Sequence, residues 1–468
     1  MKKLLFFIAF LFLAVSFSTC RKDSKTETQA PTGITGIPEW AKNSNIYEVN
    51  VRQFTPPGTF AAFRTHLRRL KAMNVGILWF MPIYPISETK RKGTLGSYYA
   101  VSDYRAVNPD FGTLEEFKLL VEEIHSLGMK VILDWVPNHT GWDHVWIKEH
   151  PEYFTQNAKG EIVDPQDPET GKSFGWADVA DLNYDNANMR AEMTEALLFW
   201  LKEVGVDGFR MDVAEQVPMA FWKECVPKLR EARPDVFMLA EAEFPPHRNE
   251  GLFAMSYGWS FHQLMKEIAQ GKKPVSAIDE WYKKDRAQFK SGYHMHFTAN
   301  HDENSWNGTE DESFGKAKDA MAVLAFTYDG MPLVYSGQEA GLNKRLEFFE
   351  KDTIEWGDFP RQQLFTQLLG IKILQPPLWN GAAGAEPRRL KTNDDSRIFA
   401  FVREKEDQRV VVMINMSNTD IDGSFKEEGL EGTYTELFSG MDMLVAPNAA
   451  YALPPWGYVV LVKKAAPQ

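Results

Sequence analysis

The feature that most constrains the fold is a regular alternation of short apolar runs with amphipathic stretches, beginning near Ile46. Residues 76–82 and 129–136 are almost continuously apolar, which is typical of strands buried on both faces of a parallel sheet. Residues 60–73 and 114–127 instead carry apolar side chains at helical spacing. The same rhythm predicts strands at 46–54, 206–213, 236–242, 294–299 and 331–335, and helices at 189–204, 219–232, 314–328 and 362–374.

About eight β–α units in succession predict a closed (β/α)8 TIM barrel, spanning residues 38–385. The alternative is an open doubly wound sheet, but no Gly-x-Gly-x-x-Gly follows an early strand. Residues 140–183 interrupt the rhythm after the third strand and predict a short inserted loop domain of the kind that usually carries function. From residue 386 to 468 short strands separated by turn residues predict a C-terminal antiparallel β domain, a β-sandwich.

The N-terminus predicts export. Lys2 and Lys3 precede an apolar stretch, 4–17, that is short for a membrane span, and small residues lead to Cys20. This pattern resembles a bacterial lipoprotein signal over residues 1–20, with Cys20 as the lipidation site; the alternative is a plain secretion signal with an incidental Cys. Lipid chains on Cys20 would hold the protein to a bacterial membrane, on the periplasmic side or the cell surface. Residues 21–37 are polar and predict a flexible tether.

The net charge and the cysteine count limit which partners the protein can bind and what its cysteines can do. The formal net charge of -12 argues against nucleic acid, because that affinity depends on neutralising phosphates. The second of the two cysteines, Cys225, lies in a predicted helix and is expected to be a buried, unreactive thiol.

Charged side chains gather where the predicted strands end. Arg210 and Asp212 alternate with apolar neighbours and therefore share one face of their strand, so the cation favours the ionised carboxylate. Taken alone, this pair could be a structural ion pair. Strand ends of a β/α barrel meet at one mouth, however, where active sites lie. The other polar residues at these ends are Asp134, Asn138, His139, Glu241, His301 and Asp302.

Several carboxylates, without a Cys/His metal cluster or a nucleophilic Ser motif, suit glycoside cleavage. That reaction needs one carboxylate to attack or stabilise an oxocarbenium-like transition state and one carboxylic acid to protonate the leaving oxygen.

The motifs resemble those of the α-amylase family, glycoside hydrolase family 13, from about residue 38 to residue 462. Five segments resemble the short conserved regions of that family: 134–139, 181–183, 208–212, 239–241 and 300–302. Three more segments resemble its second-strand loop, its eighth-strand motif and its closing C-terminal strand: 96–112, 330–339 and 454–458.

The resemblance implies a retaining double displacement with Asp212 as nucleophile and Glu241 as general acid/base. It implies that Asp302 binds the sugar hydroxyls of the reacting ring. Arg210 would orient Asp212. The resemblance also implies substrate binding around the same glucose by Tyr99, Asp134, His139, Arg210 and His301. For Asp134 a plain pairing with Arg210 inside the barrel is an equal alternative.

The implied metal is calcium, with Asn138 and Asn183 as candidate ligands and no organic cofactor. Two departures argue against it: Gln216 replaces a His that often supplies a backbone ligand, and no Asp-rich loop follows the first strand. Glu215 and Gln216 also replace a Lys-His pair on the leaving-group side, which leaves the acceptor preference open.

The main functional prediction is an α-1,4-glucan hydrolase acting on starch or maltooligosaccharides. The alternative within the enzyme class is a cyclomaltodextrinase- or neopullulanase-type hydrolase or a transglycosylase. A non-catalytic glucan-binding relative is disfavoured, because Asp212, Glu241 and Asp302 are all present. The short inserted loop predicts an open cleft, and one or two of the loop tryptophans are expected to bind sugar faces: Trp142, Trp146, Trp176, Trp259 and Trp306.

Overall fold

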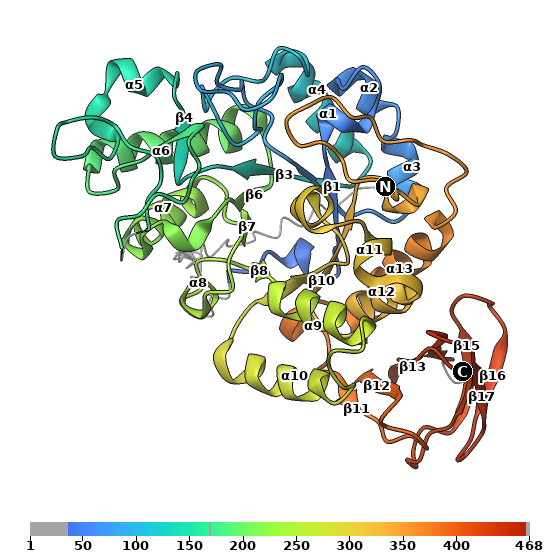
Figure 1. Cartoon of the computed structure of the whole chain (residues 1–468). Helices are drawn as coiled ribbons and strands as arrows, with labels where there is room; N and C mark the ends of the chain where they lie inside the picture. The colour runs from blue at the N-terminus through green and yellow to red at the C-terminus, as the bar shows by residue number, and fades with distance from the viewer. Residues whose placement is uncertain (1–35, 168–169, 465–468) are drawn as a thin grey trace, which may run out of the picture. The chain divides into compact units, whose positions relative to one another are not determined.

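The structure is a computed structural model that describes residues 36–167 and 170–464 (Figure 1). The predicted signal segment, Cys20 and nearly all of the predicted tether lie outside the described residues. Cys225, in contrast, is described and is a free, buried thiol.

Eight parallel strands close into a barrel, as the alternation predicted. Their order around the barrel is β1-β10-β9-β8-β7-β6-β3-β2. The strands are β1 (Ile46–Val49), β2 (Ile77–Phe80), β3 (Lys130–Trp135), β6 (Gly208–Met211), β7 (Phe237–Ala240), β8 (Met255–Tyr257), β9 (Tyr293–His296) and β10 (Met331–Tyr335).

Helices surround this barrel (Figure 1). The longer ones are α4 (Leu114–Ser126), α6 (Ala187–Phe199), α7 (Met219–Ala232), α9 (Trp259–Ala269), α10 (Ala277–Gln288), α12 (Lys318–Thr327) and α13 (Gln362–Leu374). The shorter ones are α1 (Val51–Phe54), α2 (Phe60–Arg64), α3 (Leu67–Ala72), α5 (Val145–Glu149), α8 (Pro245–Asn249) and α11 (Glu310–Phe314). None of the helices from Gly36 onward that the structure describes is both long and apolar enough to cross a membrane.

Strand β2 shows why continuous apolar runs suit this barrel. Ile77 and Trp79 belong to the cluster that fills the barrel interior, whereas Leu78 and Phe80 belong to the cluster between strands and helices. All four side chains are fully buried, because successive residues of a strand face opposite sides. Apolar side chains are therefore favoured on both faces of the strand, because neither face meets water.

Several predicted elements differ in extent from the observed ones, and two differ most. The predicted strand 46–54 stops at Val49, because the Asn50 side chain accepts a hydrogen bond from the Gln53 amide and caps α1. The predicted helix 60–73 is two short helices, α2 and α3. Strand β8 and helices α9 and α10 were not predicted, and β8 is only three residues long, too short for a periodic signal.

The segment after β3 forms a small excursion framed by its own strand pair. Strand β4 (His139–Gly141) runs antiparallel to β5 (Val179–Asp181), so the two ends of the excursion are tied together beside the barrel mouth. His139 pairs with Asp181 in this register. The pairing explains how a long insertion with little regular structure keeps fixed ends.

The C-terminal part is antiparallel, as predicted, and has a hydrophobic core that includes Leu390, Val411 and Leu461. One sheet has six strands and a second has two, β14 with β17. The strands are β11 (Arg388–Arg389), β12 (Ile398–Lys405), β13 (Gln408–Asn415), β14 (Ile421–Gly423), β15 (Gly432–Glu436), β16 (Asp442–Val445), β17 (Tyr451–Leu453) and β18 (Tyr458–Lys463).

Candidate active site

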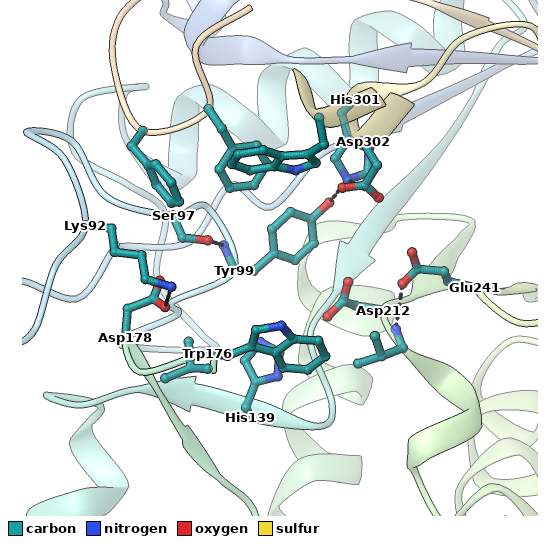
Figure 2. Close-up of a pocket in the computed structure, with 15 residues that line it drawn as sticks. Lys92, Ser97, Tyr99, His139, Trp176, Asp178, Asp212, Glu241, His301 and Asp302 are labelled. Atoms are coloured by element: carbon teal, nitrogen blue, oxygen red, sulfur yellow. Dashed lines mark hydrogen bonds and ion pairs between the residues drawn. The ribbon is translucent and has the colours of Figure 1, made fainter. Parts of the chain in front are cut away.

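A cavity of about 570 Å³ lies at the carboxyl ends of the barrel strands (Figure 2). Its volume is within the usual range for small-molecule sites. Six of the predicted site residues line it: Tyr99, His139, Asp212, Glu241, His301 and Asp302. The other lining residues are Lys92, Ser97, Trp176, Asp178, Val179, Val213, Trp306, Phe348 and Phe349.

The local geometry of β6 and β7 places the two central acids. A Cβ on Gly208 would lie 2.0 Å from the Phe237 carbonyl oxygen, so only glycine allows the two strands to approach here. Beyond the strand end, Val213 has φ of 37°, in the left-handed region that β-branched residues rarely adopt. In this conformation its amide donates a 2.7 Å hydrogen bond to Glu241 Oε2.

Arg210 is the buried centre of the acidic group. Its Nη1 donates 2.8 Å hydrogen bonds to both Asp134 Oδ1 and Asp212 Oδ1. Its Nη2 lies 3.0 Å from Glu241 Oε1, within ion-pair distance but without the alignment of a hydrogen bond. The single guanidinium of Arg210 therefore contacts three carboxylates.

Neither Arg210 nor Asp134 lines the cavity, and both are fully buried. Their predicted role as substrate-binding residues stays a prediction, and neither side chain reaches the cavity surface here. Asp134 forms the ion pair with Arg210 inside the barrel that the sequence offered as its alternative role. Both residues can act on a ligand only through the side chains that they hold.

Desolvation raises the pKa of both Asp212 and Glu241, but the two values differ. Desolvation, opposed by Arg210 and reinforced by Asp134, raises the pKa of Asp212 to about 6. Desolvation, opposed by Arg210 and reinforced by Asp212 and Asp302, raises the pKa of Glu241 to about 8. At neutral pH one carboxyl group is mainly ionised and its neighbour mainly protonated, the division that acid-assisted displacement needs.

A further buried carboxylate, Glu48 inside β1, was not predicted from the sequence. Its Oε1 lies 2.5 Å from His301 Nδ1, and His301 Nε2 lies 2.7 Å from the Tyr99 hydroxyl and 3.3 Å from Asp302 Oδ2. Burial opposes a charge on His301, but Asp302 and Glu48 outweigh it and raise the pKa to about 9. The available signal was a Glu in the middle of a strand whose other residues are apolar.

The two histidines of the cavity differ in charge. His301 is an imidazolium at neutral pH, whereas burial lowers the pKa of His139 to about 4 and keeps that ring neutral. Tyr99 lies parallel to His301, with 5.6 Å between ring centroids and 19° between ring planes, and its hydroxyl donates to Asp134 Oδ2. The cavity therefore offers both a charged and a neutral imidazole.

Aromatic rings border the cavity on two sides (Figure 2). Trp176, from the excursion, lies beside His139 with 5.7 Å between centroids. Trp306 lies near Phe348 and Phe349, and about half of its surface is exposed. Of the five predicted tryptophans these two line the cavity, and Trp142, Trp146 and Trp259 do not.

The two positions that depart from the family pattern, Glu215 and Gln216, are exposed in the turn after Val213 and do not line the cavity. An ion pair not foreseen from the sequence does border it: Lys92 Nζ lies 2.6 Å from Asp178 Oδ1.

The candidate calcium ligands are both amides with local contacts. The Asn183 side-chain oxygen accepts from the Asp185 amide, and the Asn138 side-chain nitrogen contacts the His139 ring at 3.3 Å. Within residues 36–167 and 170–464, no group of three or more His, Cys, Asp or Glu side chains is placed to hold a metal. A calcium ion at these amides would depend on neutral oxygen ligands and water, a set that binds weakly.

Comparisons with known proteins agree with this geometry. Residues 17–363 match the family model "Alpha amylase, catalytic domain". Alpha-amylase 3 of Dictyoglomus thermophilum is 27% identical over 463 residues, which cover 83% of this chain and 88% of that protein. Neopullulanase 2 of Thermoactinomyces vulgaris is 26% identical over 444 residues, which cover 81% of this chain and 70% of that protein.

A solved structure extends the agreement to three dimensions. The crystal structure of an alpha-amylase from Lactobacillus plantarum aligns with a TM-score of 0.79 and 29% identity, over 91% of this chain and all of that one. The barrel, the acids at its mouth and the family match lead to one conclusion: this chain is a glycoside hydrolase of the α-amylase family.

Proposed function

We propose that the protein hydrolyses α-1,4-glucosidic bonds of starch or maltooligosaccharides with retention of configuration. The observation that carries the proposal is the placement of Asp212, Glu241 and Asp302 on one cavity, with the pKa of Asp212 near 6 and that of Glu241 near 8. This division assigns the attacking carboxylate to Asp212 and the proton donor to Glu241.

In the first step Asp212 attacks the anomeric carbon while the Glu241 proton moves to the glycosidic oxygen. The bond to the leaving sugar breaks, and a glycosyl ester of Asp212 forms. In the second step Glu241, now ionised, removes a proton from water, whose oxygen displaces Asp212. Two inversions restore the α configuration, and retaining enzymes hold the two carboxyl groups roughly 5–5.5 Å apart.

The surrounding side chains have roles that follow from their charge. Asp302 and the His301 imidazolium offer an acceptor and a charged donor to the hydroxyls of the reacting sugar. His139 offers a neutral ring on the cavity wall. Tyr99 presents a ring face on which the apolar face of a sugar can stack.

Incubation of the purified protein with starch and with pullulan, with products separated by size and linkage, tests the substrate. Proton NMR during the first minutes tests the stereochemistry, because a retaining enzyme releases the α-anomer before mutarotation. Initial β-anomer, or no hydrolysis of any α-glucan, would overturn the proposal.

A second candidate is a cyclomaltodextrinase- or neopullulanase-type hydrolase, or a transglycosylase. Its support is the similarity to a neopullulanase and the chemistry itself, since a sugar hydroxyl can replace water in the second step. Preferred hydrolysis of cyclodextrin or pullulan over starch, or products longer than the substrate, would favour it.

The N-terminal sequence supports export and attachment through lipid on Cys20. The full chain should therefore be recovered with the membrane fraction, and the Cys20→Ala variant should not. Equal recovery of both forms in the soluble fraction would contradict the anchor.

A further inference from the structure

We infer that this enzyme attacks its glucan from the non-reducing end, in a cavity closed at the sugar-donor side by the Lys92–Asp178 ion pair. The inference rests on the proposed α-glucan hydrolysis and adds which end of the chain is used.

The direction of a bound chain follows from the positions of the proton donor and of the ion pair. Glu241, which protonates the leaving oxygen, lies at one side of the cavity, and Lys92 and Asp178 lie at the opposite side (Figure 2). The leaving part of the glucan, which contains the reducing end, must extend past Glu241. The other part, which contains the non-reducing end, must extend toward Lys92 and Asp178.

The segment that carries Lys92 is fastened on both sides. On one side, the amides of Glu88 and Thr89 donate to Asp143 Oδ2 at 2.7 and 3.1 Å, in the excursion that also carries Asp178. Lys90 Nζ lies 3.2 Å from the centre of the Trp142 ring in the same excursion.

On the other side, this segment is joined to the loop after β10. The Leu95 amide donates to the Phe349 carbonyl at 3.0 Å, and the Thr94 amide donates to Glu350 Oε1 at 2.9 Å. Arg52 donates to the carbonyls of Gly96 and Phe348, at 3.1 Å each. Three separate loops are thus linked across this end of the cavity.

The Lys92–Asp178 ion pair is partly buried, so it can close this end of the cavity as a wall. Asp178 is buried, with 8% of its side chain exposed, and Lys92 is 41% exposed. Removing the Lys92 ammonium would leave a buried carboxylate without this partner, which is costly. Both groups can also hydrogen-bond the terminal hydroxyls of a sugar, so they can recognise a chain end as well as block passage.

The test compares two substrates: maltoheptaose, and maltoheptaose whose non-reducing glucose carries an ethylidene acetal on O4 and O6. An enzyme that needs a free non-reducing end should hydrolyse the blocked substrate at least about tenfold more slowly. Equal rates would overturn the inference and leave the proposed function standing. Hydrolysis of neither would overturn the proposed function, and with it the inference.

Variants of Lys92 and Asp178 test whether this ion pair, rather than the rest of the site, causes the preference for a free chain end. Lys92→Ala should raise the rate on the blocked substrate relative to the free one, and Asp178→Asn, which preserves size, should do the same. Lys223→Ala is the matched control, because it breaks a 2.8 Å pair with Glu250 whose side chains are exposed and do not line the cavity. An unchanged substrate ratio in both folded wall variants would contradict the role of the ion pair.

Discussion

Arg210 Nη1 donates to Asp212 over 2.8 Å, yet the same nitrogen also donates to Asp134, and Glu241 is a further carboxylate at the same guanidinium. One positive charge cannot neutralise three buried carboxylates. If all were ionised the group would carry two uncompensated negative charges away from water, which is costly. The proton is retained on Glu241, whose contact with Arg210 is not aligned as a hydrogen bond.

The first prediction is a bell-shaped pH dependence of kcat/KM. Asp212 must be ionised and Glu241 protonated, so activity should rise through a pKa of about 6 and fall through a pKa of about 8. Initial rates on maltoheptaose at low substrate concentration across this range measure both limbs. A profile that keeps rising past pH 9 would contradict Glu241 as the acid.

The second prediction concerns the nucleophile. Asp212→Asn keeps the shape of the side chain but cannot form the glycosyl ester, so kcat should fall by roughly 10⁴-fold or more, as when the attacking group of other hydrolases is removed. Circular dichroism should show an unchanged fold. Substantial residual hydrolysis by a folded variant would remove the assignment.

The third prediction is that Glu241→Gln stabilises the protein at alkaline pH. An unfolded Glu loses its proton near pH 4.3, whereas the folded pKa is about 8. The stability from the retained proton is therefore complete below about pH 4.3 and is lost as the pH rises through 8. Gln resembles the protonated form at every pH, so the Tm advantage of the variant should grow over this window.

The energy involved is a few kcal/mol, since each unit of pKa difference corresponds to about 1.4 kcal/mol. Thermal melts of both proteins at pH 5 and pH 9 measure it. Glu195→Gln, on the exposed surface of α6, is the control and should show no such growth. If the Tm difference between Glu241→Gln and the unaltered protein is the same at both pH values, the prediction is wrong.

The sequence predicted the parts of this site that depend on strand ends, because a carboxylate at or shortly after the end of a buried strand lies at the barrel mouth. Asp212, Glu241 and Asp302 were found in this way. Glu48 and the Lys92–Asp178 pair were not, because their partners are distant in the chain: Glu48 and His301 are 253 positions apart. Their contacts depend on barrel closure and loop packing, which local patterns do not encode.

The fourth prediction assigns Glu48 as a positioning residue for His301. Glu48→Gln removes one of the charges that raise the His301 pKa from its ordinary value to about 9. We expect the His301 pKa in the variant to fall below the Glu241 pKa of about 8, so that loss of the imidazolium sets the alkaline limb of kcat/KM and moves it toward acid. Loss of a charge-assisted hydrogen bond of about 1.5–3 kcal/mol corresponds to roughly a 10- to 150-fold lower kcat/KM.

A control separates this role from general destabilisation. Glu339 is also fully buried, with hydrogen bonds from Tyr47 and Arg69, but does not line the cavity. Glu339→Gln should lower Tm without moving the pH optimum. If Glu48→Gln also lowers Tm and leaves the optimum in place, Glu48 is structural only.

The fifth prediction is that calcium contributes little to stability. The candidate ligands Asn138 and Asn183 are uncharged, and Asn183 already accepts from the Asp185 amide. Calcium affinity rises with the number of ligand charges, and sites with few charges bind only at about 10⁻⁴–10⁻³ M. Excess EDTA should therefore leave Tm unchanged, while millimolar calcium should raise it only slightly. A drop of several degrees in EDTA, reversed by adding calcium, would show instead that backbone oxygens and neighbouring groups such as Asp181 complete a tight site around these amides.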